Sequence, residues 1–273
     1  MRGQKLLVSR LSKKVSDVER LLLPRRWQLL GELILVHIPC GINHLKYEIG
    51  QGLLELYPRC KSVIWDKGIE GQFRRPNIEV IAGSGTKTIH TENKCKFALD
   101  VSRVMFSSGN FAERIRMSKL GFAEDVLDMF SGIGQFPVPM ATYSKPRTIT
   151  AIEINEDAFF YLKKNIHLND VCDIIEPLLG DCAQESPVSG VDRVIMGSFE
   201  AYKYLESGIK AIKPGGILHY HETVPIQLAY TRPLTRVVEA AKKLGKNVEA
   251  LEIKKVKNFS PGIWHVVLDA RIN

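Results

Sequence analysis

From about residue 120 onward, short apolar runs alternate with stretches in which apolar residues recur every three or four positions. The first kind of run is typical of a buried strand and the second of an amphipathic helix. Strands that alternate with helices of this length predict a Rossmann-like α/β domain with a parallel, doubly wound sheet. The predicted strands are 126–130, 148–154, 174–179, 193–196 and 216–221, the predicted helices are 135–144, 156–169, 202–212 and 234–244, and residues 248–272 form a last β-rich stretch.

The first hundred residues have a different pattern, which predicts a small α+β domain. Apolar residues from Leu7 to Leu22 recur at helical spacing until Pro24 ends the run. The segment Gly83-Ser84-Gly85 predicts a hairpin turn that leads from one strand into the next. The other elements predicted here are a β segment with a turn at Gly31 (27–38), a helix (47–56) and strands (62–66, 78–82, 86–92 and 97–101). We therefore expect two domains, residues 1–100 and residues 101–273.

The positive charge is concentrated in the N-terminal domain. The chain has a net charge of +8, and residues 1–100 hold 17 Lys and Arg against 10 Asp and Glu, while residues 101–273 hold 21 against 20. A basic module beside a neutral one is typical of a polyanion-binding domain attached to a catalytic domain. The alternative is a solvated basic surface without a partner.

Several classes of protein are excluded by the composition. No apolar run is long enough to cross a bilayer, and the N-terminus has neither the apolar core nor the cleavage site of a secretory signal. The five cysteines are scattered and form no CxxC pair. Such a set is typical of reduced thiols and argues against a disulfide framework or a zinc site. We expect a cytoplasmic protein that binds no membrane and no metal ion.

The segment from Val126 to Phe136 has the sequence of a cofactor loop. An apolar strand ends in Asp128, and Gly132 and Gly134 then lead into a helix. Glycines are needed where a backbone approaches a ligand closely or adopts a positive φ. Ligands of open α/β sheets bind at the carboxyl ends of the strands, where this loop is expected.

Two further strands also lead into an acid, Glu153 and Asp181. Glu153 follows the glycine loop by roughly the 20 residues expected of a ribose-binding acid, and a carboxylate at Asp181 can accept a hydrogen bond from an adenine amino group. Pro137 replaces the third glycine of the dinucleotide fingerprint, which favours a nucleoside cofactor without a pyrophosphate over NAD. The alternative, turn glycines beside surface acids, is disfavoured because three acids close successive strands.

Several motifs together resemble those of a known family. They are residues 106–116 (FSSGNFAERIR), 128–136 (DMFSGIGQF) and 151–155 (AIEIN), with 74–83, 90–100 and 260–269. Over roughly residues 20–273 the chain resembles the archaeal and eukaryotic tRNA guanine-N1 methyltransferases and their relatives, the wybutosine-synthesising aminocarboxypropyltransferases. The resemblance implies S-adenosylmethionine as the group donor and tRNA as the substrate.

The two branches of this family differ in the motif after the fourth strand. The methyltransferases carry an Asn-Leu-Pro type of sequence, whereas this chain has Met196-Gly197-Ser198, which with residues 219–225 (HYHETVP) is similar to the aminocarboxypropyltransferases. That branch implies transfer of the 3-amino-3-carboxypropyl group to C7 of 4-demethylwyosine in the anticodon arm of tRNA(Phe), with release of 5′-methylthioadenosine. The alternatives are a tRNA methyltransferase acting on the same guanosine or its tricyclic derivative, and an RNA-binding protein with a vestigial cofactor fold.

The family resemblance implies a role for each motif residue. Ser107 and Arg114 are expected to hold the carboxylate end of the cofactor, because an arginine fork fixes direction as well as position. Glu113 is the candidate general base; the alternative is a helix-terminal carboxylate, since Asn110 can cap this helix. The other expected cofactor residues are Asp128, Phe130, Gly132, Gly134, Glu153 at the ribose, and Asp181 and Cys182 at the adenine.

The RNA contacts are predicted from charge and position. Arg116 lies two residues from Arg114, so it points elsewhere on the helix and suits the RNA or a surface pair. His219 and His221 alternate on one strand and share a face, where they line the base pocket or form a polar rim. Phosphate contacts are expected from four residues of the basic domain, Arg25, Arg26, Arg74 and Arg75.

Overall fold

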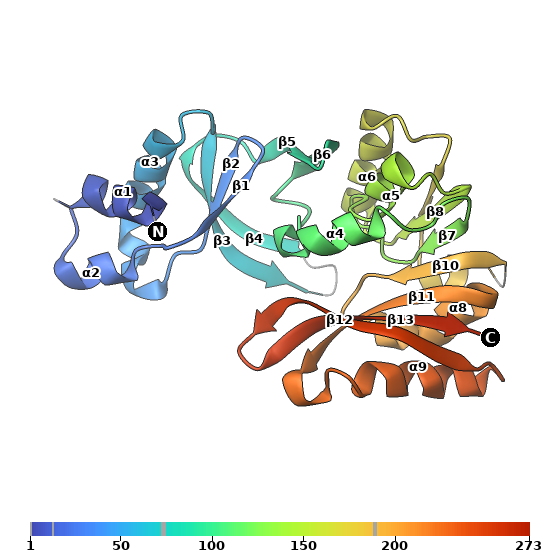
Figure 1. Ribbon diagram of the computed structural model, residues 1–273. Coiled ribbons are helices and arrows are strands. Elements are labelled where there is room, and N and C mark those ends of the chain that lie inside the picture. The colour runs from blue at the N-terminus through green and yellow to red at the C-terminus, as the bar shows by residue number, and fades with distance from the viewer. Residues whose placement is uncertain (1, 13, 72–74, 188–189) are drawn as a thin grey trace. The chain divides into compact units, whose positions relative to one another are not determined.

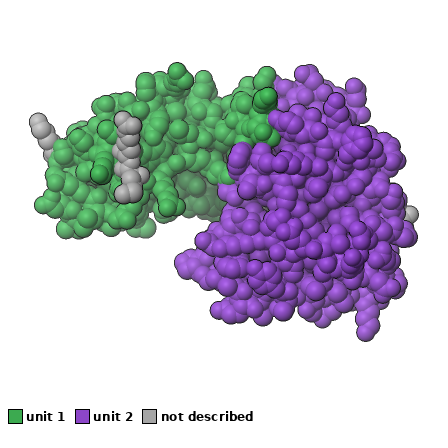
Figure 2. Space-filling model, viewed as in Figure 1, with its two compact units in different colours: residues 1–108 green, residues 109–273 purple. Residues whose placement is uncertain are grey.

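The chain forms two compact units. The computed structural model describes residues 2–12, 14–71, 75–187 and 190–273. The units are residues 1–108 and residues 109–273 (Figure 2). Residues 101–108, which the sequence placed with the second domain, fall in the first unit. None of the helices in the described ranges is long and apolar enough to cross a membrane.

The first unit combines a small sheet with helices. Its elements are α1 (Arg2–Leu11), α2 (Asp17–Leu22), β1 (Trp27–Leu30), β2 (Leu33–Val36), α3 (Lys46–Leu56), β3 (Ser62–Glu70), β4 (Arg75–Gly83), β5 (Lys87–Glu92) and β6 (Cys95–Asp100) (Figure 1). The main sheet has the order β1-β2-β3-β4, in which only β2 and β3 pair in parallel. Its core joins residues of α1, α3 and the strands, among them Leu7, Leu53, Ile34 and Ile81.

Two local predictions for this unit were wrong. The helical run from Leu7 to Leu22 is two helices, because Ser16 and Glu19 form a capping box that starts α2. The Gly83-Ser84-Gly85 segment is not a hairpin turn, because β5 pairs with β6 in a separate two-stranded sheet. The turn between these two strands is made by Asn93 and Lys94, which both adopt a positive φ.

The second unit alternates strands and helices as the sequence predicts. Its elements are α4 (Phe111–Met117), β7 (Asp125–Asp128), α5 (Pro137–Tyr143), β8 (Thr148–Glu153), α6 (Glu156–Leu168), β9 (Ile175–Leu179), α7 (Cys182–Glu185), β10 (Val191–Met196), α8 (Leu205–Ala211), β11 (Ile212–Pro225), α9 (Arg232–Lys243), β12 (Val248–Ser260) and β13 (Ile263–Ile272). They form a sheet of seven strands in the order β12-β13-β11-β10-β7-β8-β9. The Rossmann-like α/β fold is confirmed.

The sheet is not fully parallel, because the strands formed by the C-terminal part of the chain pair antiparallel. The five strands from β9 to β11 are parallel to their neighbours, whereas β13 runs antiparallel to both β11 and β12. This arrangement follows from the chain: β12 and β13 are joined by a short turn at Pro261 and Gly262, which permits only antiparallel pairing. The turn therefore lies at the same edge of the sheet as the carboxyl end of β11, since Pro225 is the partner of Ile263.

Helices cover both faces of this sheet. Helix α4 packs beside α5 and helix α8 beside α9, and Figure 1 shows the two pairs on opposite faces. Apolar side chains of the strands meet those of α8 and α9 in one core, for example Leu218 with Ile209 and Val237. Loops follow the carboxyl ends of the parallel strands. This end of the sheet is therefore available to a ligand.

Candidate active site

The loop after β7 has the geometry expected of a cofactor loop. Gly132 and Gly134 adopt φ values of +55° and +95°, which side chains disfavour. The Gly132 N–H donates to Oε2 of Glu153 over 2.7 Å, so the loop is held against the end of β8. A Cβ atom at Gly132 would meet no atom within 4 Å, whereas one at Gly134 would lie 2.9 Å from Cγ2 of Val138. Open space in front of Gly132 allows its backbone to approach a ligand.

Gly134→Ala should lower the free energy of unfolding by about 1–3 kcal/mol, because it combines an unfavourable φ with a steric contact. Urea unfolding followed by circular dichroism measures this loss. Gly132→Ala is the matched control: it makes the same change in open space and should cost only about 1 kcal/mol. A larger loss for Gly132→Ala than for Gly134→Ala would contradict this account of the loop.

Asp128 ends β7, and its side chain is completely buried. Its Oδ1 accepts a hydrogen bond from the Phe130 N–H over 3.1 Å, while its Oδ2 has no hydrogen-bond partner. Burial, together with the nearby charge of Glu153, raises the pKa of Asp128 to about 7. A buried carboxylate oxygen without a partner, next to a glycine loop, suits a ligand with hydrogen-bond donors or positive charge.

Glu153 and Asp181 lie where the sequence placed them, at the ends of β8 and β9. Glu153 also accepts from the Asn155 N–H over 2.8 Å, and burial raises its pKa. Asp181 caps α7 by accepting from the Ala183 N–H over 2.9 Å. The thiol of Cys182 is buried, and burial together with the charge of Asp181 raises its pKa to about 12. Cys182 therefore presents a neutral, weakly polar surface.

Phe130 is an aromatic residue of the loop after β7. Its ring packs edge to face on Tyr204, with the ring centroids 5.6 Å apart. Strand-end carboxylates, an open glycine backbone and apolar side chains suit a nucleoside that carries a positive charge.

Helix α4 brings Glu113 and Arg114 into the unit, and both side chains are nearly completely buried. The Arg114 Nη1 donates to Oε1 of Gln135 over 3.1 Å, so its guanidinium lies beside the glycine loop. Asn110 precedes the helix, but its side chain makes no capping hydrogen bond. The capping that the sequence allowed for Asn110 is therefore absent.

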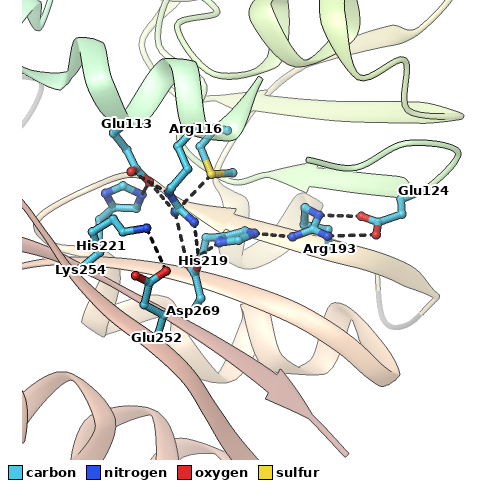
Figure 3. A network of polar contacts seen from close by, with 10 residues as sticks. Glu113, Arg116, Glu124, Arg193, His219, His221, Glu252, Lys254 and Asp269 are labelled. Atoms are coloured by element: carbon cyan, nitrogen blue, oxygen red, sulfur yellow. Dashed lines mark hydrogen bonds and ion pairs between the residues drawn. The ribbon is translucent and has the colours of Figure 1, made fainter. Parts of the chain in front are cut away.

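Glu113 is paired with Arg116 in a buried cluster of charges (Figure 3). Nε and Nη2 of Arg116 donate to the two Glu113 oxygens over 2.9 and 2.6 Å, and Nη1 and Nη2 donate to the two oxygens of Asp269 over 2.5 and 3.2 Å. Although burial opposes it, the bonds to Glu113 and then to Asp269 raise the pKa of Arg116. The expected contact of Arg116 with RNA or a surface pair is corrected: its spacing of three residues from Glu113 puts it inside the unit.

The same cluster continues from Asp269 across the sheet. The Asp269 Oδ1 lies 2.6 Å from Nδ1 of His219, and Nε2 of His219 lies 2.5 Å from Nη1 of Arg193. Nε and Nη2 of Arg193 donate to Glu124 over 2.6 and 2.9 Å. Burial lowers the pKa of His219, so its partners assign a neutral ring that donates from Nδ1 and accepts at Nε2. Both nitrogens of His219 are occupied, so it does not offer one to a substrate base.

His221 lies on the same face of β11 as His219 and is equally buried. Its Nδ1 is 3.0 Å from Nε2 of His265, and its Nε2 is 3.8 Å from Oε1 of Glu113. Burial and neighbouring charge lower the pKa of His221 to about 3 and that of His265 to about 2. Two neutral rings result, and a proton on His221 Nε2 faces the Glu113 carboxylate. In the described part of the chain, no three His, Cys, Asp or Glu are grouped to hold a metal ion.

His265→Gln should flatten the acid side of the stability profile. The folded-state pKa of about 2 lies below the ordinary 6.5, so between these values the unfolded chain binds a proton that the folded protein does not. Stability is then lost as pH falls through this window, by about 1.4 kcal/mol per pH unit for each such group. Urea unfolding between pH 4 and 6 should give a slope smaller by about one proton in the variant. An unchanged slope would show that His265 is not held neutral.

Comparison with protein families now decides the class of this site. A family model described as the TRM5/TYW2 methyltransferase domain matches residues 88–250, and a second, the TYW2 N-terminal domain, matches residues 7–86. The chain belongs to the TRM5/TYW2 family.

Individual TRM5/TYW2 relatives match over most of their length. The tRNA(Phe) (4-demethylwyosine(37)-C(7)) aminocarboxypropyltransferase of Methanocaldococcus jannaschii is 37% identical over 90% of this chain and 97% of that protein. The tRNA (guanine(37)-N(1))-methyltransferase Trm5b of Pyrococcus abyssi is 36% identical over 93% of this chain and 77% of that protein. The crystal structure of P. horikoshii TYW2 in complex with MeSAdo is similar with a TM-score of 0.87, at 34% identity and 98% coverage of both chains.

The remaining predicted residues of this TRM5/TYW2 chain lie in the first unit. Arg25, Arg26 and Arg75 are exposed. Arg74 lies outside the described residues. Ser107 is partly buried and lies next to the last residue of that unit. The second unit therefore brings together Glu113, Arg114 and the residues predicted for the cofactor, apart from Ser107.

Sequence reasoning missed several residues of this TRM5/TYW2 site, namely Glu124, Gln135, Arg193, His265 and Asp269. One available signal was Arg193, a cation inside the apolar run of a central strand, because buried arginine requires a carboxylate partner. The identity of that partner was not available. Glu124 and Asp269 are 69 residues before and 76 residues after Arg193 in the chain, and only the sheet order brings them together.

Proposed function

We propose that this enzyme transfers the 3-amino-3-carboxypropyl group of S-adenosylmethionine to C7 of 4-demethylwyosine in tRNA(Phe), beside the anticodon, and releases 5′-methylthioadenosine. The match of residues 7–86 to the TYW2 N-terminal domain carries this proposal, because it distinguishes the two branches of the family. The likeness to the M. jannaschii aminocarboxypropyltransferase supports the same reaction. Met196-Gly197, in place of the Asn-Leu-Pro type of motif, is consistent with it.

The residues at the sheet edge fit S-adenosylmethionine. Each Glu153 oxygen accepts one backbone N–H and retains a lone pair for the ribose hydroxyls. Asp181 and the neutral thiol of Cys182 suit the polar edge and the face of the adenine. The unpartnered Oδ2 of Asp128 suits a donor or a positive charge of the amino acid part. When bound, the cofactor supplies a sulfonium whose three attached carbons can each be attacked.

Arg114 decides which carbon is presented, in this proposal. Its buried guanidinium beside Gln135 can grip the carboxylate of the methionine part through two parallel hydrogen bonds. A carboxylate fixed in this way holds the chain that bears the γ-carbon, so that this carbon and not the methyl group faces the base. Holding the reacting atoms in line accounts for most of the rate gain in such a transfer.

Glu113 takes the proton that the reaction releases. A bond forms between C7 of the base and the γ-carbon, and the bond from that carbon to sulfur breaks, with both electrons leaving on the sulfur as a thioether. The proton on C7 must then be removed for the base to recover its aromatic system. Arg116 fixes the direction of both Glu113 oxygens, which retain lone pairs for this proton.

We assign the enzyme and its RNA substrate to the cytoplasm. We assign phosphate contacts to the exposed Arg25, Arg26 and Arg75 of the basic unit. These contacts serve the anticodon arm of tRNA(Phe) in this proposal. Affinity for tRNA should then fall steeply with salt, since each phosphate contact releases bound counterions.

The reaction is tested with S-adenosylmethionine labelled in its carboxyl group and with tRNA that carries 4-demethylwyosine. Label retained in the RNA, in equal amount to the 5′-methylthioadenosine released, is the expected result. Formation of S-adenosylhomocysteine without labelled RNA would instead make the enzyme a methyltransferase of the same family. A matched incubation with tRNA lacking the tricyclic base should give neither labelled RNA nor 5′-methylthioadenosine.

A further inference from the structure

A row of aromatic rings connects the glycine loop with the β12–β13 hairpin. The centroids of Phe136 and His221 are 5.5 Å apart, those of His221 and His265 are 5.2 Å apart, those of His265 and Phe199 are 4.9 Å apart, and those of Phe199 and Phe259 are 5.1 Å apart. The rings come from five separate parts of the chain: the residue before α5, strand β11, strand β13, the loop after β10 and the end of β12. They form a continuous series of ring contacts, most of it buried, at the carboxyl ends of the strands.

The two ends of this row differ in exposure. Phe136 is buried and directly precedes α5, beside the cofactor loop. Phe259 is 51% exposed at the end of β12, where its ring packs edge to face on Phe199. The row therefore begins at the site of group transfer and ends in solvent. Only its outer end is open to a molecule as large as tRNA.

The same hairpin also lies close to the catalytic helix. A Cβ atom at Gly109 would lie 2.9 Å from Cδ of Lys257, so the stem of this lysine passes directly against the backbone that leads into α4. Glu113 follows four residues later. A base held by the hairpin is thus held near the group that accepts the proton.

The charge around Phe259 is positive. The strand that leads to it carries Lys255 and Lys257, and Nζ of Lys255 lies 4.1 Å from the ring centroid of Trp264 on β13. Basic side chains interleaved with aromatic rings are typical of surfaces that bind single-stranded nucleic acid. A single exposed Phe needs no explanation, but one that closes an aromatic row at a basic edge of the active site has the properties of a stacking platform.

We propose that Phe259, supported by Phe199, stacks on a nucleobase of the tRNA substrate. This proposal rests on the proposed function, because it assumes that the enzyme acts on tRNA. Edge-to-face packing leaves one face of the Phe259 ring free of Phe199, and every base has a π face that such a ring can accept. The contact is tolerant of sequence, so it holds a base that the phosphate contacts of the basic unit have brought to the site.

The test is the affinity of tRNA carrying 4-demethylwyosine for three variants at Phe259. Phe259→Ala should raise the Kd for tRNA about 10-fold, as expected for the loss of one stacked base. Phe259→Leu should do the same, since it restores the apolar packing on Phe199 without an aromatic face. Phe259→Trp should bind as tightly as the parent. Phe122→Ala is the matched control. Phe122 is 77% exposed, but it precedes β7 and therefore lies at the amino ends of the parallel strands, away from their carboxyl ends.

Two outcomes would overturn the proposal. Either Phe259→Ala binds tRNA as well as the parent, or Phe259→Leu restores parent affinity, which would make the ring a packing element only. The affinity of each variant for S-adenosylmethionine, measured by calorimetry, should be unchanged. This control would show that the cofactor site is intact. If the parent itself does not bind tRNA, the proposed function fails, and the assignment of Phe259, which rests on it, fails with it; tight binding by both the parent and Phe259→Ala contradicts the assignment of Phe259 alone.

Two further arms identify the base and separate stacking from charge. With tRNA that has no base at the reacting nucleotide, the difference between parent and Phe259→Ala disappears if Phe259 stacks on the reacting base and persists if it stacks on a neighbour. Lys255→Ala should reduce the slope of log Kd against log salt by about 1, as for one phosphate contact. Phe259→Ala should leave that slope unchanged; a reduced slope would show that the ring acts through the lysines.

Discussion

Glu113→Gln should lower kcat by about 100- to 10,000-fold, the range that a positioned general base supplies. The amide has the shape of the carboxylate, and its one oxygen can still accept one of the two hydrogen bonds from Arg116, but it cannot take the proton from C7. Single-turnover transfer of carboxyl-labelled S-adenosylmethionine to tRNA measures the loss. The Kd for S-adenosylmethionine should be unchanged, because Arg114 and the strand-end carboxylates are untouched.

A matched carboxylate outside the site separates chemistry from charge. Glu206→Gln removes the same charge from a side chain of α8 that is 46% exposed and pairs with Lys243 on α9. It should leave kcat unchanged. If Glu113→Gln turns over at the parent rate, Glu113 is not the base, and its pairing with Arg116 has only a structural role.

Asp269→Ala should lower the free energy of unfolding by about 3–5 kcal/mol, the cost of leaving one partner of a buried ion pair uncompensated. The substitution removes an acceptor from Arg116 and leaves Nδ1 of His219 without its partner. Against the effect of burial, the hydrogen bond to His219 and then the bond to Arg116 hold the pKa of Asp269 well below its usual range. Its contribution is therefore present at neutral pH and disappears only when the carboxylate is protonated in strong acid. Urea unfolding at pH 7 measures the loss.

Two variants define the origin of that loss. Asp269→Asn keeps an acceptor oxygen but not the charge, so it should fall between Ala and the parent. Glu206→Ala breaks an exposed pair with Lys243 and should leave the unfolding midpoint nearly unchanged. Equal losses for Asp269→Ala and Glu206→Ala would mean that the buried cluster adds no stability beyond that of a surface pair.

The sequence was sufficient for features that depend on neighbouring residues. The alternation of apolar runs and helical stretches predicted the strands from β7 to β11 and the fold, because each element carries its own period. The positions of Gly132, Gly134 and Glu153 followed in the same way, since a strand, a tight turn and a helix are contiguous in the chain. The hairpin predicted at Gly83-Ser84-Gly85 failed because glycine signals a turn but does not specify which strands pair.

Features that depend on the sheet order could not be derived from a single sequence. Arg116 was assigned to the RNA or to a surface pair because helix geometry gives its angle from Arg114. That geometry does not show that the Asp269 carboxylate lies next to Arg116. Asp269 lies 153 residues after Arg116, and only the antiparallel β13 beside β11 brings them together. The pairing of His221 with His265 has the same origin. A local pattern thus locates a candidate residue, and the long-range topology gives it its partner.

The position of β13 has a consequence for how this enzyme folds during its synthesis on the ribosome. It follows all the other strands of the sheet in the chain, yet it is inserted between β11 and β12, which do not pair with each other. While the ribosome is still adding residues 263–272, β11 has an open edge, β12 has no neighbour, and Arg116 lacks its second carboxylate. Exposed strand edges invite wrong pairing, so the nascent chain is vulnerable during this interval. Activity should appear abruptly with the last strand, and a chain terminated before Ile263 should be degraded rather than partly active.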